Sequence, residues 1–289
     1  MPRLKNVPVY LFGFTAGLML LLDSLGQSHS TTLIVLLWIY LFGVPHGGLD
    51  LLYIRRCFHK EAGKQLVIIA SYTGLVVLSF MVWLKLPVIS MVIFLVASAW
   101  HFSGDWQPES SRCQRLMLGL LAVVVPAITH REETGQIFAW LLLPCEAAGI
   151  IALGMQYLAL IMLCILLIQV VMGKLRKEVA CPASMMVVGG LLLSPILYFA
   201  SYFCGLHAIV NMIRTFQQFQ GQSKSLIFYL ALSMFFTTLL FLVAYIYLAK
   251  LQTLQVELSS LFIGLFSLTM PHIILHFVLT RLSSFYLVE

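Results

Sequence analysis

Five of the eight histidines in this chain lie within stretches that are otherwise apolar, and they are the residues best suited to chemistry. An ionisable side chain at membrane depth is costly and usually faces the interior of a helix bundle, so each of the five is a candidate functional residue. Neutral imidazole is a good ligand for zinc, copper, iron and nickel. These candidate metal ligands are His46, His101, His207, His272 and His276.

Two of the histidines are followed four positions later by an aspartate. The motif PHGGLD holds His46 and Asp50, and the motif HFSGD holds His101 and Asp105. Side chains at this spacing share one face of a helix. A carboxylate can accept the N–H of a neighbouring imidazole and leave the other ring nitrogen for a metal. We therefore expect Asp50 and Asp105 to orient metal ligands rather than to bind the metal.

Two further motifs repeat the four-residue spacing. GLHAIVN holds His207 and Asn211, and MPHIILHF holds His272 and His276, which can both face one metal. A lone histidine in a membrane often serves only as a hydrogen-bond partner between helices, but four paired motifs together favour a metal site. A proton relay or a transporter site is the main alternative. Transporters tend to contain internal repeats, and none is evident in this sequence.

The ligand types narrow the choice of metal. No cysteine lies in the four motifs, which argues against a Cu(I) thiolate or a structural zinc site. A histidine-rich site supported by carboxylates within a bilayer suits Fe(II) acting with O₂ on a lipid-soluble substrate. From the residues alone we expect a membrane oxygenase with a hydrophobic substrate.

The composition describes the elements that must position these residues. Of 289 residues, 61% are hydrophobic and 10% are charged, and the mean hydropathy is +0.99. Soluble domains are about 45–50% apolar and about 25% charged. These values exclude a soluble globular enzyme and a disordered chain. They also exclude a nucleic-acid-binding protein, because the net charge of +6 is spread over short loops and not gathered in one patch. We expect residues 1–289 to form a single integral membrane domain.

Stretches free of charged residues predict eight or nine membrane crossings, all of them helical. A crossing needs about 20 apolar residues, and its backbone must be paired within the segment. The run 134–145 is too short to cross and is predicted to be interfacial or re-entrant. The run 179–213 is too long for one straight helix and contains Pro182 and Pro195. It predicts a kinked helix, or a helix followed by a half-helix.

The basic residues predict the orientation. They cluster before the first span and in several of the following loops, so the positive-inside rule places the N-terminus in the cytoplasm, in an inner (plasma) membrane. The first arginine after each motif follows its histidine by 7 to 11 residues, which would put the imidazoles in one layer if the four helices ran in the same direction. For the four helices to run in the same direction, the chain must cross the membrane once more between 116 and 190 than the predicted spans allow, or the Lys174–Lys177 cluster must lie outside. The sequence leaves both alternatives open.

The motifs PHGGLD and HFSGD, the segment around His207, and the Pro271–His272 pair resemble the Brp/Blh family of membrane β-carotene 15,15′-dioxygenases. The resemblance extends from about residue 40 to about residue 280. It implies cleavage of the central double bond of all-trans β-carotene with O₂ to give two all-trans retinal molecules. It also implies non-haem Fe(II) held by histidines, and a product that serves as the chromophore of a microbial rhodopsin.

One position departs from the family pattern. The family usually has a second histidine four residues after the one that matches His207, and Asn211 stands there in this chain. An asparagine oxygen is a possible weak ligand in its place, or His272 or His276 completes the site. Alternatives are another carotenoid or terpenoid substrate, an inactive relative, or a carrier or rhodopsin assembly factor that holds carotenoid or retinal without catalysis. Because β-carotene is wholly apolar, we expect cavity shape to decide which bond meets the metal.

Overall fold

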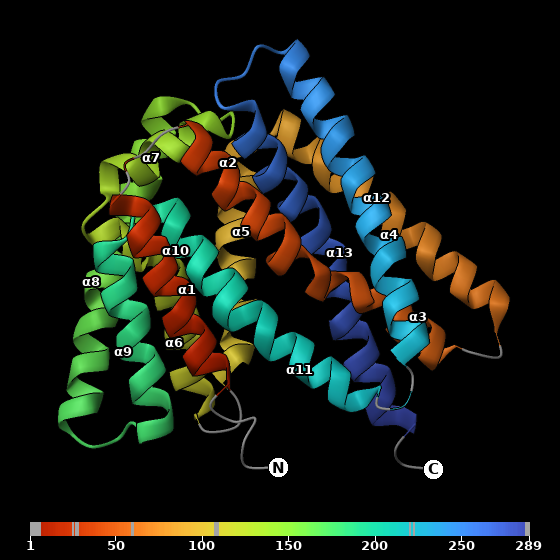
Figure 1. The fold of residues 1–289 in the computed structure, drawn as a ribbon, viewed down its shortest axis with the longest axis horizontal. Helices are drawn as coiled ribbons and strands as arrows, with labels where there is room; N and C mark the ends of the chain where they lie inside the picture. Colours follow the sequence, from red (N-terminus) through yellow and green to blue (C-terminus); the bar gives the residue numbers. More distant parts are fainter. Residues whose placement is uncertain are drawn as a thin grey trace.

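The structure is a computed structural model that describes residues 7–24, 26, 29–58, 61–106, 110–219, 221 and 223–286, without the side chains at 7, 29, 46, 223 and 280–286. In this part of the chain every regular element is helical (Figure 1). Seven helices are long and apolar enough to cross a membrane, or eight if one bent pair is taken as a span. The protein is an all-α polytopic membrane protein, as expected, and eight is the lower of the two predicted numbers of crossings.

The first half of the chain contains helices of 8 to 24 residues. Pro87 stands at the start of one of them, where its missing N–H is not needed by the helix. These helices are α1 (Val7–Ser24), α2 (His29–Trp38), α3 (Asp50–Cys57), α4 (Ala62–Lys85), α5 (Pro87–Phe102), α6 (Arg112–Val124) and α7 (Arg131–Trp140).

The second half contains the longest helices. The run 179–213 is divided where Leu193 and Ser194 adopt extended backbone angles before Pro195, so it forms the end of one helix and most of another. The helices of this half are α8 (Cys145–Val171), α9 (Lys177–Leu192), α10 (Pro195–Tyr202), α11 (Ile209–Gln218), α12 (Ser223–Lys250) and α13 (Val256–Tyr286).

Short segments of non-α helix interrupt these elements, and the first three histidine motifs lie in or beside them. Such segments are frequent at functional sites because they change the direction of side chains relative to an α-helix. Two are π-helical, η2 (Ile39–Gly43) and η6 (Phe203–Ala208), and three are 3₁₀-helical, η3 (Val44–Leu49), η4 (Ser103–Trp106) and η5 (Val125–Ile128).

The path of the chain from α6 to α9 gives the helices that carry the histidine motifs a common direction. The chain bends by 101° between η5 and α7, which agrees with the re-entrant character predicted for 134–145. The chain then descends through α8 and ascends through α9, so α9 supplies the extra reversal (Figure 1). As a result α2–α3, α5, α10–α11 and α13 all run in the same direction.

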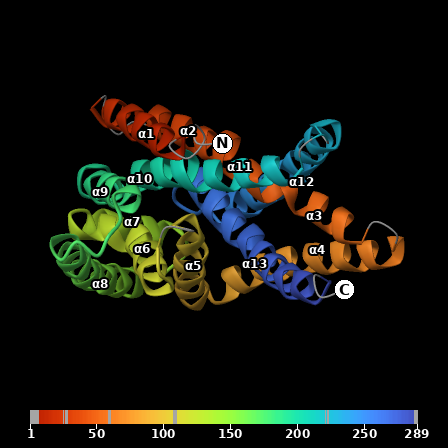
Figure 2. The ribbon, with the colours of Figure 1, turned by 90° about the horizontal axis from the view of Figure 1, so that it is seen from below.

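Helix α13 lies at the centre of the half of the bundle that contains the histidines. It packs against α4 on one side and α12 on the other, and η3 also contacts it. Figure 2 shows α13 passing between α5 and α12. The outer faces of α4, α8 and α12 carry many exposed leucine, isoleucine, valine and phenylalanine side chains, which is the surface that a bilayer would cover.

Candidate metal centre

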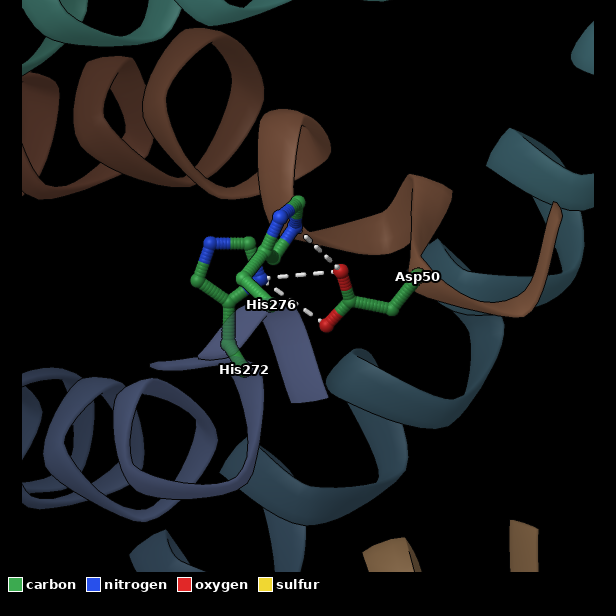
Figure 3. A group of neighbouring side chains, drawn as sticks. All are labelled: Asp50, His272 and His276. Carbon is green, nitrogen blue, oxygen red and sulfur yellow. Dashed lines mark hydrogen bonds and ion pairs between the residues drawn. The ribbon is translucent and has the colours of Figure 1, made fainter. Parts of the chain in front are cut away.

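The last helix brings a histidine pair to the aspartate of the first motif. Figure 3 shows His272 and His276 of α13 directed toward Asp50 at the start of α3. The Nδ1 atom of His272 lies 2.9 Å from both carboxylate oxygens, and Nε2 of His276 lies 3.3 Å from Oδ1. Asp50 is 3% exposed and His272 is 8% exposed. This buried carboxylate is therefore hydrogen-bonded to a histidine that lies 222 residues away in the sequence.

A second histidine–aspartate pair has the same form. His207 lies in η6 and is fully buried, and its Nδ1 atom lies 3.0 Å from both carboxylate oxygens of Asp105 in η4. A carboxylate can only accept, so Nδ1 of His207 and Nδ1 of His272 carry the hydrogens. In a neutral imidazole the other nitrogen, Nε2, then keeps its lone pair. Both rings are thus held as potential metal ligands.

Each aspartate also accepts a hydrogen bond from a tyrosine, which the sequence analysis did not anticipate. The hydroxyl of Tyr72 in α4 donates to Asp50 at 2.9 Å, and that of Tyr202 in α10 donates to Asp105 at 3.1 Å. The two Tyr–Asp–His sets come from different helices and have the same connectivity. Tyrosines are common in apolar runs, and neither Tyr72 nor Tyr202 lies three or four residues from a residue of the motif it contacts. The sequence therefore gives no signal for these two tyrosines.

His101 joins the two sets. Its ring centroid lies 4.8 Å from that of His207 and 5.1 Å from that of His272, and both ring pairs meet edge to face. The rings of His272 and His276 are 4.5 Å apart. The structure therefore brings four of the five predicted histidines into one connected cluster.

The remaining predicted residues lie at the edges of this cluster. The backbone of His46 is part of η3, but its side chain is outside the described part of the structure. Its neighbour Gly47 lines the cluster, since a Cβ atom added there would lie 4.0 Å from Nδ1 of His272. Asn211 donates from Nδ2 to the backbone carbonyl of His207 at 2.9 Å, and the same nitrogen lies 3.4 Å from the His207 ring. Its role as a weak ligand stays a prediction.

The partners of the aspartates differ from those that the i, i+4 spacing suggests. Positions four apart share a face in an α-helix, but His46 lies in the 3₁₀ segment that precedes α3, and α5 gives way to 3₁₀ geometry two residues before Asp105. A 3₁₀-helix has three residues per turn, so positions four apart no longer share a face. Asp50 and Asp105 consequently point to histidines of other helices. Arg214 holds the 3₁₀ segment η4, which contains Asp105, by donating to the backbone carbonyl of Gly104 at 3.0 Å.

Close packing supports the π-helical segment that carries His207. Phe203 stacks on His207 with 5.7 Å between ring centroids, and Phe102 lies against the same ring at 4.7 Å. Gly43 admits the Phe203 ring, because a Cβ atom there would overlap it. Gly205 likewise admits α1, since its Cβ atom would overlap Thr15. The two phenylalanine rings therefore pack against His207, and the two glycines allow the close approach of the neighbouring segments.

A cavity of about 470 Å³ opens from the histidine cluster. His101, His207, His272 and Asp50 line it, and most of its remaining wall is apolar. Ligand pockets typically enclose about 300–1,000 Å³ and combine apolar walls with a few converging polar groups. In the described residues, Asp50, His272 and His276 also form a group whose ligand atoms lie within 4.8 Å of one another and could hold a metal ion.

The fold and site thus define a class: a polytopic helical membrane protein with a buried histidine–aspartate centre open to an apolar cavity. The family model for beta-carotene 15,15′-dioxygenase matches residues 37–280. The chain is also similar to a beta-carotene 15,15′-dioxygenase of uncultured marine bacterium 66A03, with 27% identity over 244 residues that cover 81% of this chain and 88% of the relative. No solved structure matches the chain. This chain belongs to the beta-carotene 15,15′-dioxygenase family and is an enzyme of that kind.

Proposed function

We propose that this protein cleaves the central double bond of all-trans β-carotene with O₂, using Fe(II) held by the histidine cluster. The two alkene carbons each become an aldehyde carbon, and each aldehyde takes one oxygen atom of O₂. The alkene is oxidised as O₂ is reduced, so the products are two retinal molecules and no external reductant is consumed. The observation that carries this proposal is the pair of buried histidines whose Nδ1 atoms are both occupied by aspartates.

The donor set fits iron. Imidazole nitrogens are suitable ligands for Fe(II), and histidine ligands commonly donate their second N–H to a carboxylate. His207 and His272 have this arrangement, and the edge-to-face ring of His101 lies between them. We assign the metal to His101, His207 and His272, with His46 as the fourth ligand. Iron bound there would supply the site at which O₂ is activated.

The other polar residues then hold the ligands in place. Asp50 and Asp105 offset the metal charge and fix two imidazole rings, while Tyr72 and Tyr202 fix the carboxylates. We assign His276 to Asp50 rather than to the metal, because its nearest carboxylate contact uses Nε2 and its side chain is 43% exposed. Asn211 is assigned to the turn that carries His207.

The environment of the reaction is an inner (plasma) membrane, with the N-terminus in the cytoplasm. Basic side chains at the end of α3, the start of α6 and the α8–α9 turn support this orientation, because all three lie at one end of the bundle (Figure 1). The substrate reaches the apolar cavity from the bilayer, and the retinal serves as the chromophore of a microbial rhodopsin.

Expression in carotene-producing bacteria tests the function. The wild-type protein should bleach the orange colour and form retinal, whereas His101→Ala combined with His207→Ala should leave the colour and remove iron from the purified protein. The buried position of His207 makes loss of folding a separate concern, so the variant must also retain its helical circular dichroism. Bleaching by the double variant, or a wild-type protein without iron, would reject the assignment.

A further inference from the structure

The histidines lie at only one end of the large cavity. Along α13 the cavity wall runs from Leu265 to His272, and along α5 it runs from Phe94 to His101 and the adjacent Phe102. Because α5 and α13 run in the same direction (Figure 1), both histidines mark the same end. On α12, which runs in the opposite direction, the wall begins at Ser233 beside Gly48 and ends at Val243. The end that is remote from the histidines is therefore apolar.

Val76, Phe94 and Leu265 line this remote end, and a cluster of aromatic side chains packs against Phe94. The ring of Trp83 packs on that of Phe266 at 4.8 Å, and Phe94 lies 5.9 Å from Phe266. Trp83 is fully buried and its indole N–H donates to the carbonyl of Leu141 at 2.9 Å, which fixes the ring. Just beyond the cavity, Phe80 of α4 meets Tyr247 of α12. Phe94, which lines the remote end, is thus backed by aromatic rings that are fixed in place.

The cavity is long enough for one half of a carotenoid. The lining segment of α12, residues 233–243, advances about 15 Å at 1.5 Å per residue. A full-length extended carotenoid is comparable to the hydrocarbon thickness of a bilayer, about 30 Å. Only one arm of the molecule can therefore lie between the histidines and the remote end of the cavity.

A second, smaller cavity does not provide room for the other arm. This cavity of about 110 Å³ lies on an adjoining face of α5 and shares Phe94, Ser98, Phe102 and Phe199 with the large one. It extends along α5 in the same direction from the histidines, as far as Met91. A straight polyene with its centre at the histidines cannot place its two arms side by side, so the second arm must leave the histidine end in another direction.

We propose, on the basis of the proposed function, that the large cavity is a one-ended ruler. The ring of the enclosed arm rests against the remote end that Val76, Phe94 and Leu265 line, and the distance from these side chains to the histidines selects the bond that is cut. The position of the second arm does not set the register. The central bond is selected because the enclosed arm fills the cavity when that bond lies at the histidines.

The variant Val76→Phe tests this ruler. Val76 is buried, lines the cavity and lies one helical turn before Phe80, so a larger side chain there shortens the remote end. The substrate should shift outward, and the bond at the histidines becomes one conjugated double bond nearer to the enclosed ring. The products become a shorter ketone, because that bond carries a methyl group, and a longer aldehyde. The ratio of ketone to retinal should rise by roughly 10- to 200-fold, the discrimination of a methylene-sized change in an apolar pocket.

Val67→Phe is the matched control, since Val67 lies on the same helix, is 64% exposed and does not line the cavity. It should give retinal alone. Leu265→Ala, which lengthens the remote end, is a second test variant that avoids overpacking and should also release the ketone and the longer aldehyde. If Val76→Phe or Leu265→Ala cleaves β-carotene to retinal alone, the ruler is wrong. A wild-type protein that forms no retinal would instead reject the proposed function.

Discussion

Asp50 and Asp105 each decide which nitrogen of a histidine is available to a metal. By accepting a hydrogen bond from Nδ1, they leave Nε2 of His272 and of His207 with a lone pair. Each carboxylate is itself held by a tyrosine hydroxyl. Two layers of buried polar contacts therefore hold the rings of these two candidate ligands in place.

Asp105→Asn should weaken Fe(II) binding by about 10- to 100-fold, the usual effect of removing a carboxylate behind a histidine ligand. Tyr202→Phe should have a smaller effect in the same direction, because it frees the carboxylate without removing it. Tyr198→Phe is the control, since Tyr198 is a buried tyrosine that donates to the carbonyl of Ala122 instead. Titration of the metal-free proteins with Fe(II) under anaerobic conditions measures the three affinities. Equal affinities for Asp105→Asn and the wild type would contradict this role.

His272→Ala should abolish iron retention, whereas His276→Ala should retain iron with reduced affinity. The reason is that the ring of His272 contacts that of His101 directly, while His276 contacts Oδ1 of Asp50 from a half-exposed position. Iron content after purification distinguishes the two variants. Equal loss from both would indicate that the metal lies between Asp50, His272 and His276, the alternative group of close ligand atoms.

The sequence predicted the residue types of this centre, but it could not predict the pairings. The motifs identified His101, His207, His272, Asp50 and Asp105. The contact between Asp50 and His272 depends on how α13 packs beside α3, and no local spacing encodes that arrangement. Tyr72 and Tyr202 were missed for the same reason, because only tertiary packing turns them toward the aspartates.

At the scale of elements, departures from α-helical geometry position the site. The π-helical segment η6 carries His207, and the 3₁₀ segments η3 and η4 lie next to Asp50 and contain Asp105, respectively. Apolar periodicity predicts that a helix is present. Over a few residues it does not distinguish an α-helix from a 3₁₀-helix or a π-helix. The long helices were accordingly predictable, whereas the division of the run 179–213 into two helices remained one of two alternatives.

Gly119→Ala should destabilise the protein by about 1–3 kcal/mol, the usual cost of overpacking. A Cβ atom at Gly119 would lie 2.6 Å from the backbone nitrogen of Ser103, so α6 would be pushed away from the end of α5 that carries His101. Gly154→Ala in α8 is the matched control, because a Cβ atom there meets nothing within 4 Å and alanine is the better helix former. Thermal unfolding in detergent should give a lower Tm for Gly119→Ala and an unchanged or higher Tm for Gly154→Ala. The reverse order would contradict the α5–α6 packing.

At the scale of the whole molecule, the common direction of the four site helices puts the histidines in one layer. Basic residues then gather at the end of the bundle toward which these helices run, as in the last turn of α3. The sequence already indicated this layer from the spacing between histidines and arginines. The sequence did not predict that the chain reverses direction at α9, because that helix begins in a polar loop and is too short to count as a crossing by length.

Native cysteines at opposite ends of the bundle test the orientation. Cys57 ends α3 and Cys145 begins α8, and both are exposed. In intact cells, a membrane-impermeant maleimide should label a variant that keeps only Cys145 and should label one that keeps only Cys57 after permeabilisation. The opposite pattern would place the N-terminus outside the cytoplasm.

The central claim is that the histidine cluster is an iron site that cleaves β-carotene with O₂ alone. The most direct measurement supplies purified protein, loaded with Fe(II) in detergent, with β-carotene and isotopically labelled O₂, without NADH or a reductase. Two retinal molecules should form per β-carotene, each carrying labelled oxygen when it is trapped by rapid reduction, and metal-free protein should form none. A strict requirement for NADH and a reductase, or unlabelled oxygen in the trapped product, would contradict the account.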